Sequence, residues 1–112
     1  MTLTIQNIEE AKETIKQNDI VLFMKGTKDM PGCGFSAQVI QILNHLKVNY
    51  IDIDVLNDDN FKENMKKFTN WPTFPQLYVK GEFVGGCDIV KEMFESGELL
   101  ELFNTKGIDI KI

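Results

Sequence analysis

The sequence has only two cysteines, Cys33 and Cys87, and this scarcity excludes a fold built on a framework of disulfides. So small a number in a chain of 112 residues favours a reducing compartment. The sequence contains neither a zinc-type cluster of cysteines nor the spacing of an EF-hand calcium loop. With only two thiols, the position of each one along the chain indicates what it can do.

Long apolar runs and clusters of basic residues are also missing. No apolar stretch approaches the roughly 20 residues that a helix needs to cross a bilayer. The formal net charge is −5, and an acidic chain without a basic stripe is a poor candidate for binding nucleic acid or an anionic membrane surface. The N-terminus has neither a secretory apolar core nor an Arg-rich transit pattern. We expect a cytoplasmic protein, or one of the mitochondrial matrix or another organelle if a transit peptide has been removed.

The overall composition is that of a globular protein, and the length suits a single domain over residues 1–112. Apolar residues at helical spacing predict a first helix over 5–17 with Thr4 as its N-cap. The continuous apolar run Ile20–Met24 predicts a strand buried on both faces. Two glycines and a proline make Lys25–Gly32 a loop. The chain thus begins with a helix, a buried strand and a loop.

Helices and strands continue to alternate in the middle of the chain. A second helix follows Cys33 and ends near Leu46, and a second strand covers 49–54. Asp58 and Asp59 begin a third helix. Its apolar side is formed by Phe61, Met65 and Phe68.

The last part of the chain predicts a β-hairpin followed by two helices. Strands over 76–79 and 82–84 flank a turn at Lys80-Gly81. Asp88 is the expected N-cap of the next helix, and Gly97 separates that helix from the final one. Strands separated by a helix pair in parallel through a right-handed crossover, whereas a hairpin adds antiparallel strands. We therefore predict an α/β fold with a small mixed four-stranded sheet and helices on both faces.

Cys33 stands directly after Pro31-Gly32 and directly before the second helical pattern. A cysteine at the start of a helix faces unpaired backbone N–H groups and the positive end of the helix dipole, and both favour the thiolate. A redox pair of the Cys-x-x-Cys type would have its second cysteine at position 36, where this chain has Ser36. Because Cys33 cannot close a disulfide over that span, its chemistry requires a thiol from elsewhere.

Four motifs in this order resemble the monothiol glutaredoxins, a subclass named for the tetrapeptide Cys-Gly-Phe-Ser (CGFS). They are Lys25, Cys33-Gly34-Phe35-Ser36, Trp71-Pro72-Thr73-Phe74-Pro75-Gln76 and Gly85-Gly86-Cys87-Asp88. The resemblance covers about residues 5–107 and implies a thioredoxin-like fold. It also identifies Cys33 as the reactive thiol.

The resemblance further implies a glutathione site beside Cys33. Lys25 alone would be an ordinary surface lysine, but in the family the matching residue contacts glutathione. Thr73, Phe74 and Pro75 would by themselves be a rigid turn. In the family the matching proline is cis, and the residue before it offers its backbone to the peptide of glutathione.

Other parts of the expected glutathione site come from later in the chain. The segment matching Gly86, Cys87 and Asp88 holds the γ-glutamyl carboxylate in the family, and Asp88 can pair with the neighbouring ammonium group. Lys62 matches a basic position that meets the glycyl carboxylate. Because arginine is common there, the lysine loses bidentate binding. Phe35 completes the site as an aromatic residue next to the thiol.

Cys87 is open to two interpretations, because its exposure cannot be read from the sequence. It is either a structural thiol or a slow disulfide partner of Cys33. The two interpretations carry equal weight at this point.

The resemblance implies that the chain carries iron–sulfur clusters. A [2Fe-2S] cluster needs four thiolates, and in monothiol glutaredoxins two chains and two glutathione molecules supply them. Cys33 would then be the metal ligand of each chain. The expected partners are glutathione, a second copy in a cluster-bridged homodimer, and iron–sulfur acceptor proteins.

The alternative is a glutathione-dependent thiol–disulfide oxidoreductase that removes glutathione from protein mixed disulfides through Cys33. A third possibility, an adaptor without chemistry, is disfavoured by the intact thiol site. The open apolar rim at Gly34-Phe35-Ser36 suits a cluster and a second chain, and the stretch Gly26–Met30 is typical of the cluster-binding subclass. We therefore favour cluster carriage, with at most weak oxidoreductase activity.

Overall fold

Residues 7–110 are described by a computed structural model of the chain, and helices and strands alternate through most of them. The helices are α1 (Ile8–Gln17), α2 (Gly34–Leu46), α3 (Asp59–Thr69), α4 (Cys87–Ser96) and α5 (Glu98–Thr105). The strands are β1 (Ile20–Met24), β2 (Ile51–Asp54), β3 (Gln76–Val79) and β4 (Glu82–Gly85). The predicted order of elements is confirmed. None of the helices in this range has the length and apolar character needed to cross a membrane.

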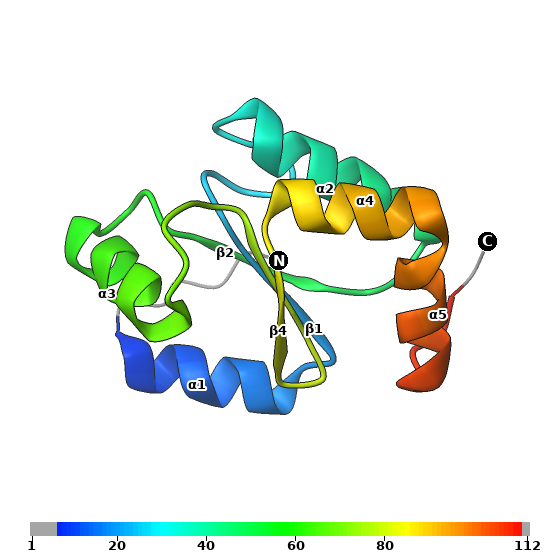
Figure 1. Ribbon diagram of the computed structural model, residues 1–112. Coiled ribbons are helices and arrows are strands. Elements are labelled where there is room, and N and C mark those ends of the chain that lie inside the picture. The colour runs from blue at the N-terminus through cyan, green and yellow to red at the C-terminus, as the bar shows by residue number, and fades with distance from the viewer. Residues whose placement is uncertain (1–6, 111–112) are drawn as a thin grey trace.

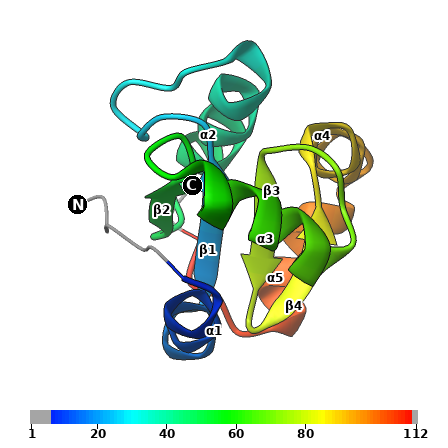
Figure 2. The same ribbon diagram turned by 90° about the vertical axis from the view of Figure 1, so that its left-hand side faces the viewer.

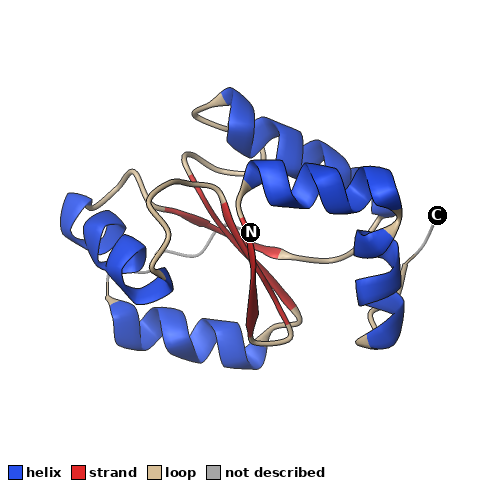
Figure 3. Cartoon of the chain, in the orientation of Figure 1, coloured by secondary structure: helices blue, strands red, loops and turns tan. Residues whose placement is uncertain are grey.

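The strands form one mixed four-stranded sheet in the order β2-β1-β3-β4. β2 pairs with β1 in parallel, whereas β3 is antiparallel to both β1 and β4. Helix α2 makes the crossover between the parallel strands, and Lys80-Gly81 forms the hairpin turn between β3 and β4, as predicted. Figure 1 and Figure 3 show the sheet between two groups of helices. The predicted α/β fold is therefore confirmed.

Strand β1 lies inside the sheet and is buried along its whole length. Its alternate residues enter two separate apolar clusters. Ile20, Leu22 and Met24 pack in the cluster beneath α2, α4 and α5, while Val21 and Phe23 pack in the cluster beneath α1 and α3. Figure 2 shows the two helix groups on opposite sides of the strands. The prediction of a strand buried on both faces is confirmed.

The starts of two elements differ from the prediction. Helix α1 begins at Ile8 because Asn7 is its N-cap, with the side-chain oxygen accepting a hydrogen bond from the backbone N–H of Glu10 at 2.9 Å. Thr4, the predicted N-cap, lies outside the described residues. Strand β2 begins at Ile51, two residues later than predicted, because only from there does it pair with β1.

Two side chains also take other positions than predicted. Helix α4 begins at Cys87, so its N-cap is Gly86, which makes no side-chain cap, and Asp88 lies in the first turn. Phe68 was expected on the apolar side of α3, but it is 40% exposed in the last turn. Its ring lies beneath the ammonium group of Lys12 on α1, 5.5 Å from the nitrogen, so it borders the helix pair rather than the sheet.

Candidate functional site

The structure places Cys33 at the N-cap of α2, with extended backbone angles. Its Sγ accepts a hydrogen bond from the backbone N–H of Ser36 at 3.5 Å, and lies 3.4 Å from the Ser36 hydroxyl oxygen. Ser36 is fully buried, and its hydroxyl oxygen also accepts the backbone N–H of Lys25 at 3.3 Å. The serine that replaces a second cysteine therefore joins the thiol to the end of β1.

These contacts lower the pKa of Cys33 below the ordinary value of a cysteine. Partial burial acts in the opposite direction and raises it. The hydrogen bonds from the side chain and backbone of Ser36, the backbone N–H of Phe35 and the charge of Lys25 together outweigh that effect. The thiolate of Cys33 is therefore more populated near neutral pH than that of a free cysteine.

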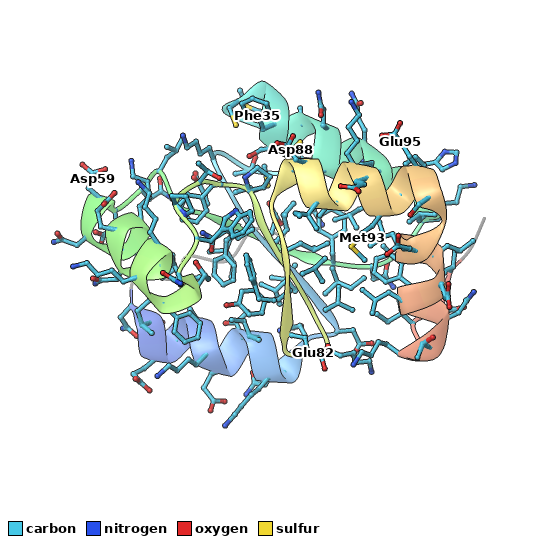
Figure 4. All side chains as sticks on the ribbon, in the orientation of Figure 1. Phe35, Asp59, Glu82, Asp88, Met93 and Glu95 are labelled. Atoms are coloured by element: carbon cyan, nitrogen blue, oxygen red, sulfur yellow. The ribbon has the colours of Figure 1, made fainter. Side chains whose placement is uncertain are left out.

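A groove of about 300 Å³ lies beside the segment that carries the thiol. Four parts of the chain form it: the residue after β1, the start of α2, the loop before β3, and the start of α4. Its lining residues are Lys25, Phe35, Trp71, Thr73, Phe74, Gly86, Cys87 and Asp88. Figure 4 shows Phe35 and Asp88 at the starts of α2 and α4, where these two helices meet. A groove of this size admits a small ligand.

Most of the residues predicted for the glutathione site line this groove, and three do not. Cys33 lies next to the groove, because Phe35, two residues further along the chain, lines it. Pro75 is buried, and the bond before it is cis, as the resemblance implied. Lys62, the third, lies on α3, where its Nζ is 4.0 Å from an oxygen of Asp59, and it is not part of the groove lining. Figure 4 shows Asp59 on α3, apart from Phe35 and Asp88.

Gly86 lies in a space that has no room for a side chain. A Cβ atom built there would stand 2.9 Å from Nε1 of Trp71 and 3.2 Å from the carbonyl oxygen of Pro75. The start of α4 can therefore lie directly against the loop before β3, and glycine is required for that contact.

Gln76 and Trp71 are the residues of this site that sequence reasoning missed. The buried amide of Gln76 donates to the carbonyl oxygens of Trp71 at 3.2 Å and Thr73 at 3.1 Å, so it fixes the loop before β3. Trp71 entered the sequence analysis only as the first residue of a motif, whereas its side chain lines the groove. The available signal was a glutamine at the first position of an apolar strand, where a buried amide N–H needs an acceptor.

Cys87 is a buried thiol at the start of α4, 8% exposed, and it also borders the groove. Its S–H donates to the side-chain oxygen of Gln38 at 3.2 Å. Burial raises the pKa of Cys87, and the negative charge of Asp88 adds to the rise. Cys87 is therefore held in the protonated form near neutral pH, which disfavours a role as an attacking thiol.

The mixed sheet, the thiol at the start of the helix after β1 and the cis-proline loop beside it define a protein of the thioredoxin-like class. The family profile named glutaredoxin matches residues 20–84. The chain is 58% identical over 106 residues to the probable monothiol glutaredoxin 2 of Rickettsia typhi, covering 95% of this chain and 96% of that protein. The chain belongs to the glutaredoxin family, and within it to the monothiol glutaredoxins.

Solved structures agree with this assignment. The solution structure of a monomeric truncated mutant of Trypanosoma brucei 1-C-Grx1 matches with a TM-score of 0.87 at 39% identity, over 96% of this chain and 98% of that one. The solution structure of reduced poplar apo GrxS14 matches with a TM-score of 0.78 at 44% identity, over 88% of this chain and 90% of that one. The thioredoxin-like glutaredoxin fold is thus confirmed.

Proposed function

We propose that this chain is a glutathione-dependent carrier of [2Fe-2S] clusters, which it holds between two copies and transfers to acceptor proteins. The observation that carries the proposal is the pairing of Cys33 with Ser36: a thiol whose thiolate is favoured, with a hydroxyl in the place of a resolving cysteine. Such a thiol can bind metal but cannot be consumed by a disulfide across the same turn.

The number of ligands supports a pair of chains. A [2Fe-2S] cluster takes four thiolates, and Cys33 is the one thiol of this site whose pKa is lowered. Two copies of the chain and two glutathione thiols complete the set. In this proposal the cluster is the cargo. Because two of its ligands belong to glutathione and not to the chain, these ligands can be exchanged when the cluster is released.

The surface around Cys33 suits contact with a second copy. Met30, Phe35 and Leu56 are apolar side chains that are 79%, 61% and 48% exposed. Leu56 lies against Gly32, since a Cβ atom built on that glycine would be 3.1 Å from its methyl carbon. Apolar side chains next to the thiol would shield a cluster from water, which stabilises iron–sulfur ligation.

The groove supports glutathione as the second source of thiol. Lys25 at one side offers a positive charge for a carboxylate. At the other side Gly86 makes no side-chain cap, so the first backbone N–H groups of α4 remain for a ligand carboxylate, and exposed Asp88 can pair with an ammonium group. Lys62, whose Nζ lies near Asp59, has no part in this proposal for the glycyl carboxylate.

A second candidate function, glutathione-dependent thiol–disulfide exchange, is favoured by the lowered pKa of Cys33. The Cys33 thiolate would attack the glutathione sulfur of a protein mixed disulfide, releasing the protein thiolate and leaving glutathione bound to Cys33. A second glutathione thiolate would then attack that disulfide, releasing oxidised glutathione and regenerating the Cys33 thiolate. We place this activity second because Ser36 and the residues around it match the cluster-binding subclass.

The test is reconstitution without oxygen from iron, sulfide and glutathione, followed by visible absorption and sedimentation. The native chain should become coloured and change from monomer to dimer, and omission of glutathione should prevent both changes. Cys33→Ser should abolish the chromophore, and the matched variant Cys87→Ser should keep most of it. A strong chromophore in Cys33→Ser, or a stable dimer before loading, would overturn the proposal. No chromophore together with rapid turnover on a glutathionylated substrate would put the second function first.

A further inference from the structure

The segment between β1 and Cys33, residues 25–32, which we call the thiol loop, is closed on itself. The backbone N–H of Gly32 donates to the carbonyl oxygen of Lys25 at 2.7 Å, and an isolated bridge joins Gly26 to Pro31. Thr27 and Met30 exchange two backbone hydrogen bonds at the tip, of 3.2 and 3.1 Å. The loop therefore forms a short hairpin that begins at Lys25 and ends beside Cys33.

Two carboxylates from the neighbouring strand β2 hold this hairpin from one side. Oδ1 of Asp54 accepts the backbone N–H of Gly26 at 3.0 Å and that of Leu56 at 2.8 Å. Oδ2 of Asp52, a fully buried residue, accepts the backbone N–H of Lys28 at 2.8 Å. Hydrogen bonds to a carboxylate are stronger than those between neutral groups, so these contacts add a substantial restraint to that of the loop's own turns.

The parallel pairing of β1 and β2 explains why these carboxylates reach the thiol loop. Asp54 is the register partner of Met24, the last residue of β1 before Lys25, and the backbone N–H of Val55 donates to Met24 at 2.9 Å. The end of β2 thus lies beside the point where the thiol loop begins. The pairing of β1 with β2 therefore decides which carboxylates hold the thiol loop, and residues adjacent to the loop in the sequence do not.

Gly26 makes the anchored conformation a tight one. Its φ of +88° lies in the left-handed region, and a Cβ atom built there would be 2.5 Å from the backbone nitrogen of Gly32 and from the carbonyl oxygen of Met30. The two sides of the hairpin therefore touch at the residue whose N–H is bound by Asp54.

A short chain of contacts leads from Asp54 to the reactive sulfur. Gly26 is held by Asp54 and is bonded covalently to Lys25, whose backbone N–H donates to the Ser36 hydroxyl oxygen at 3.3 Å. That oxygen lies 3.4 Å from Sγ of Cys33. The same restraint fixes the backbone of Lys25 and therefore the point from which its side chain extends to the groove lining.

We propose that Asp54, assisted by Asp52, is a positioning residue for Cys33: its carboxylate holds the thiol loop in the conformation that keeps Lys25 and Ser36 in place around the sulfur. The consequence for cluster lifetime rests on the proposed function, but the positioning itself does not. Asp54 touches neither the sulfur nor the groove, so it acts only through the loop.

The test compares three substitutions in the full chain. Asp54→Ala removes the acceptor of two N–H groups, while Asp54→Asn keeps an oxygen that can accept both. Asp58→Ala is the matched control, because Oδ1 of Asp58 also accepts two backbone N–H groups, those of Asn60 and Phe61, at the start of α3. Two readouts need neither glutathione nor a cluster: hydrogen exchange of the Gly26 amide, and the pH profile of iodoacetamide alkylation at Cys33, followed on its own peptide by mass spectrometry.

In Asp54→Ala the Gly26 amide should exchange about five- to tenfold faster, as expected when a hydrogen bond to a charged acceptor is lost. The alkylation profile of Cys33 should move to higher pH, so that the rate at pH 7 falls about two- to threefold. Asp54→Asn should stay within about twofold of the native chain in both readouts. Asp58→Ala should change neither, although it loses a comparable amount of stability.

An unchanged Cys33 profile in Asp54→Ala, with the chain folded, would overturn the proposal, as would an equal shift in Asp58→Ala. If Asp54→Ala does not fold, Asp52→Ala gives the answer: it removes the acceptor of the Lys28 N–H and leaves the contacts of Asp54 in place, and the alkylation profile of Cys33 should still move to higher pH. Where the native chain forms a cluster, its lifetime should be shorter in Asp54→Ala. Failure of the native chain to form one would overturn the proposed function and leave the alkylation result standing.

Discussion

Cys33 and Cys87 both lie at the start of a helix and beside the same groove, yet their surroundings shift their pKa values in opposite directions. Cys33 is the N-cap of α2, and its pKa is lowered. Cys87 is the first residue of α4, and its pKa is raised. The helix dipole is favourable at both positions, so it does not decide which thiol is reactive.

Burial raises the pKa of both thiols, so the difference comes from the hydrogen bonds and charges near each sulfur. Cys33 accepts hydrogen bonds from the first turn of α2, which contains no acidic residue. Cys87 is buried, gives its S–H to Gln38, and has Asp88 next to it in the first turn of α4. A cysteine at a helix start is therefore activated only where the sulfur is an acceptor and no carboxylate stands beside it.

The largest expected effect is the difference in reactivity between the two thiols of the native chain. At pH 7 iodoacetamide should modify Cys33 about tenfold faster than Cys87, because the opposite directions of the two pKa shifts and the lower exposure of Cys87 all favour reaction at Cys33. As the pH rises, Cys33 should ionise below the ordinary value of 9.0 and Cys87 above it. Peptide mass spectrometry follows both sites in one sample.

The control for this experiment is the chain unfolded in urea, where both thiols lose their surroundings and their rates should converge. Equal rates in the folded chain, or a faster Cys87, would contradict the comparison of the two sites.

A smaller effect is expected from Ser36→Ala, which removes the hydroxyl that supports the thiolate. The pKa of Cys33 should rise, and its alkylation at pH 7 should slow several-fold, whereas Cys87 should not change. The backbone N–H of Lys25 also loses its acceptor, so the free energy of unfolding should fall by about 1 kcal/mol, measured in urea. Ser96→Ala removes an exposed serine hydroxyl at the end of α4 and serves as the control. A Cys33 profile that does not move in Ser36→Ala would refute the role given to this serine.

The smallest effect is expected from Asp88→Asn, which removes the negative charge next to Cys87. Burial is the main cause of the raised pKa of Cys87 and remains, so this pKa should fall only in part, with alkylation about twofold faster. The rate at Cys33 should stay the same, because Asp88 does not contribute to its pKa. Glu92→Gln, one turn further along α4, is the charge-matched control. An equal acceleration in both variants would point to net charge rather than to this neighbour.

The features that the sequence predicted correctly are those set by local pattern. The apolar run Ile20–Met24 is a strand buried on both faces, and Lys80-Gly81 is a hairpin turn with both residues in the left-handed region. Cys33 at the start of a helix follows from Pro31-Gly32 before an amphipathic pattern. Each depends on residues close together in the chain, where spacing and backbone preference decide the outcome.

The features that the sequence did not predict depend on contacts between distant segments. The polar and apolar alternation of β2 indicated a strand, but not that Asp52 and Asp54 bind the thiol loop through its backbone. Every residue except proline has the same backbone N–H group, so no sequence pattern marks such a partner. In the same way, the burial of Cys87 and its hydrogen bond to Gln38 depend on the packing of α4 against α2, two helices far apart in the sequence.

Trp71 gives the groove an optical property of its own. The chain has one tryptophan, and its indole lies in the groove wall against Gly86. Indole emission depends on the polar groups around the ring, and a ligand in the groove would change them. Because no other tryptophan adds background, the fluorescence of the unlabelled chain reports directly on what enters and leaves this groove.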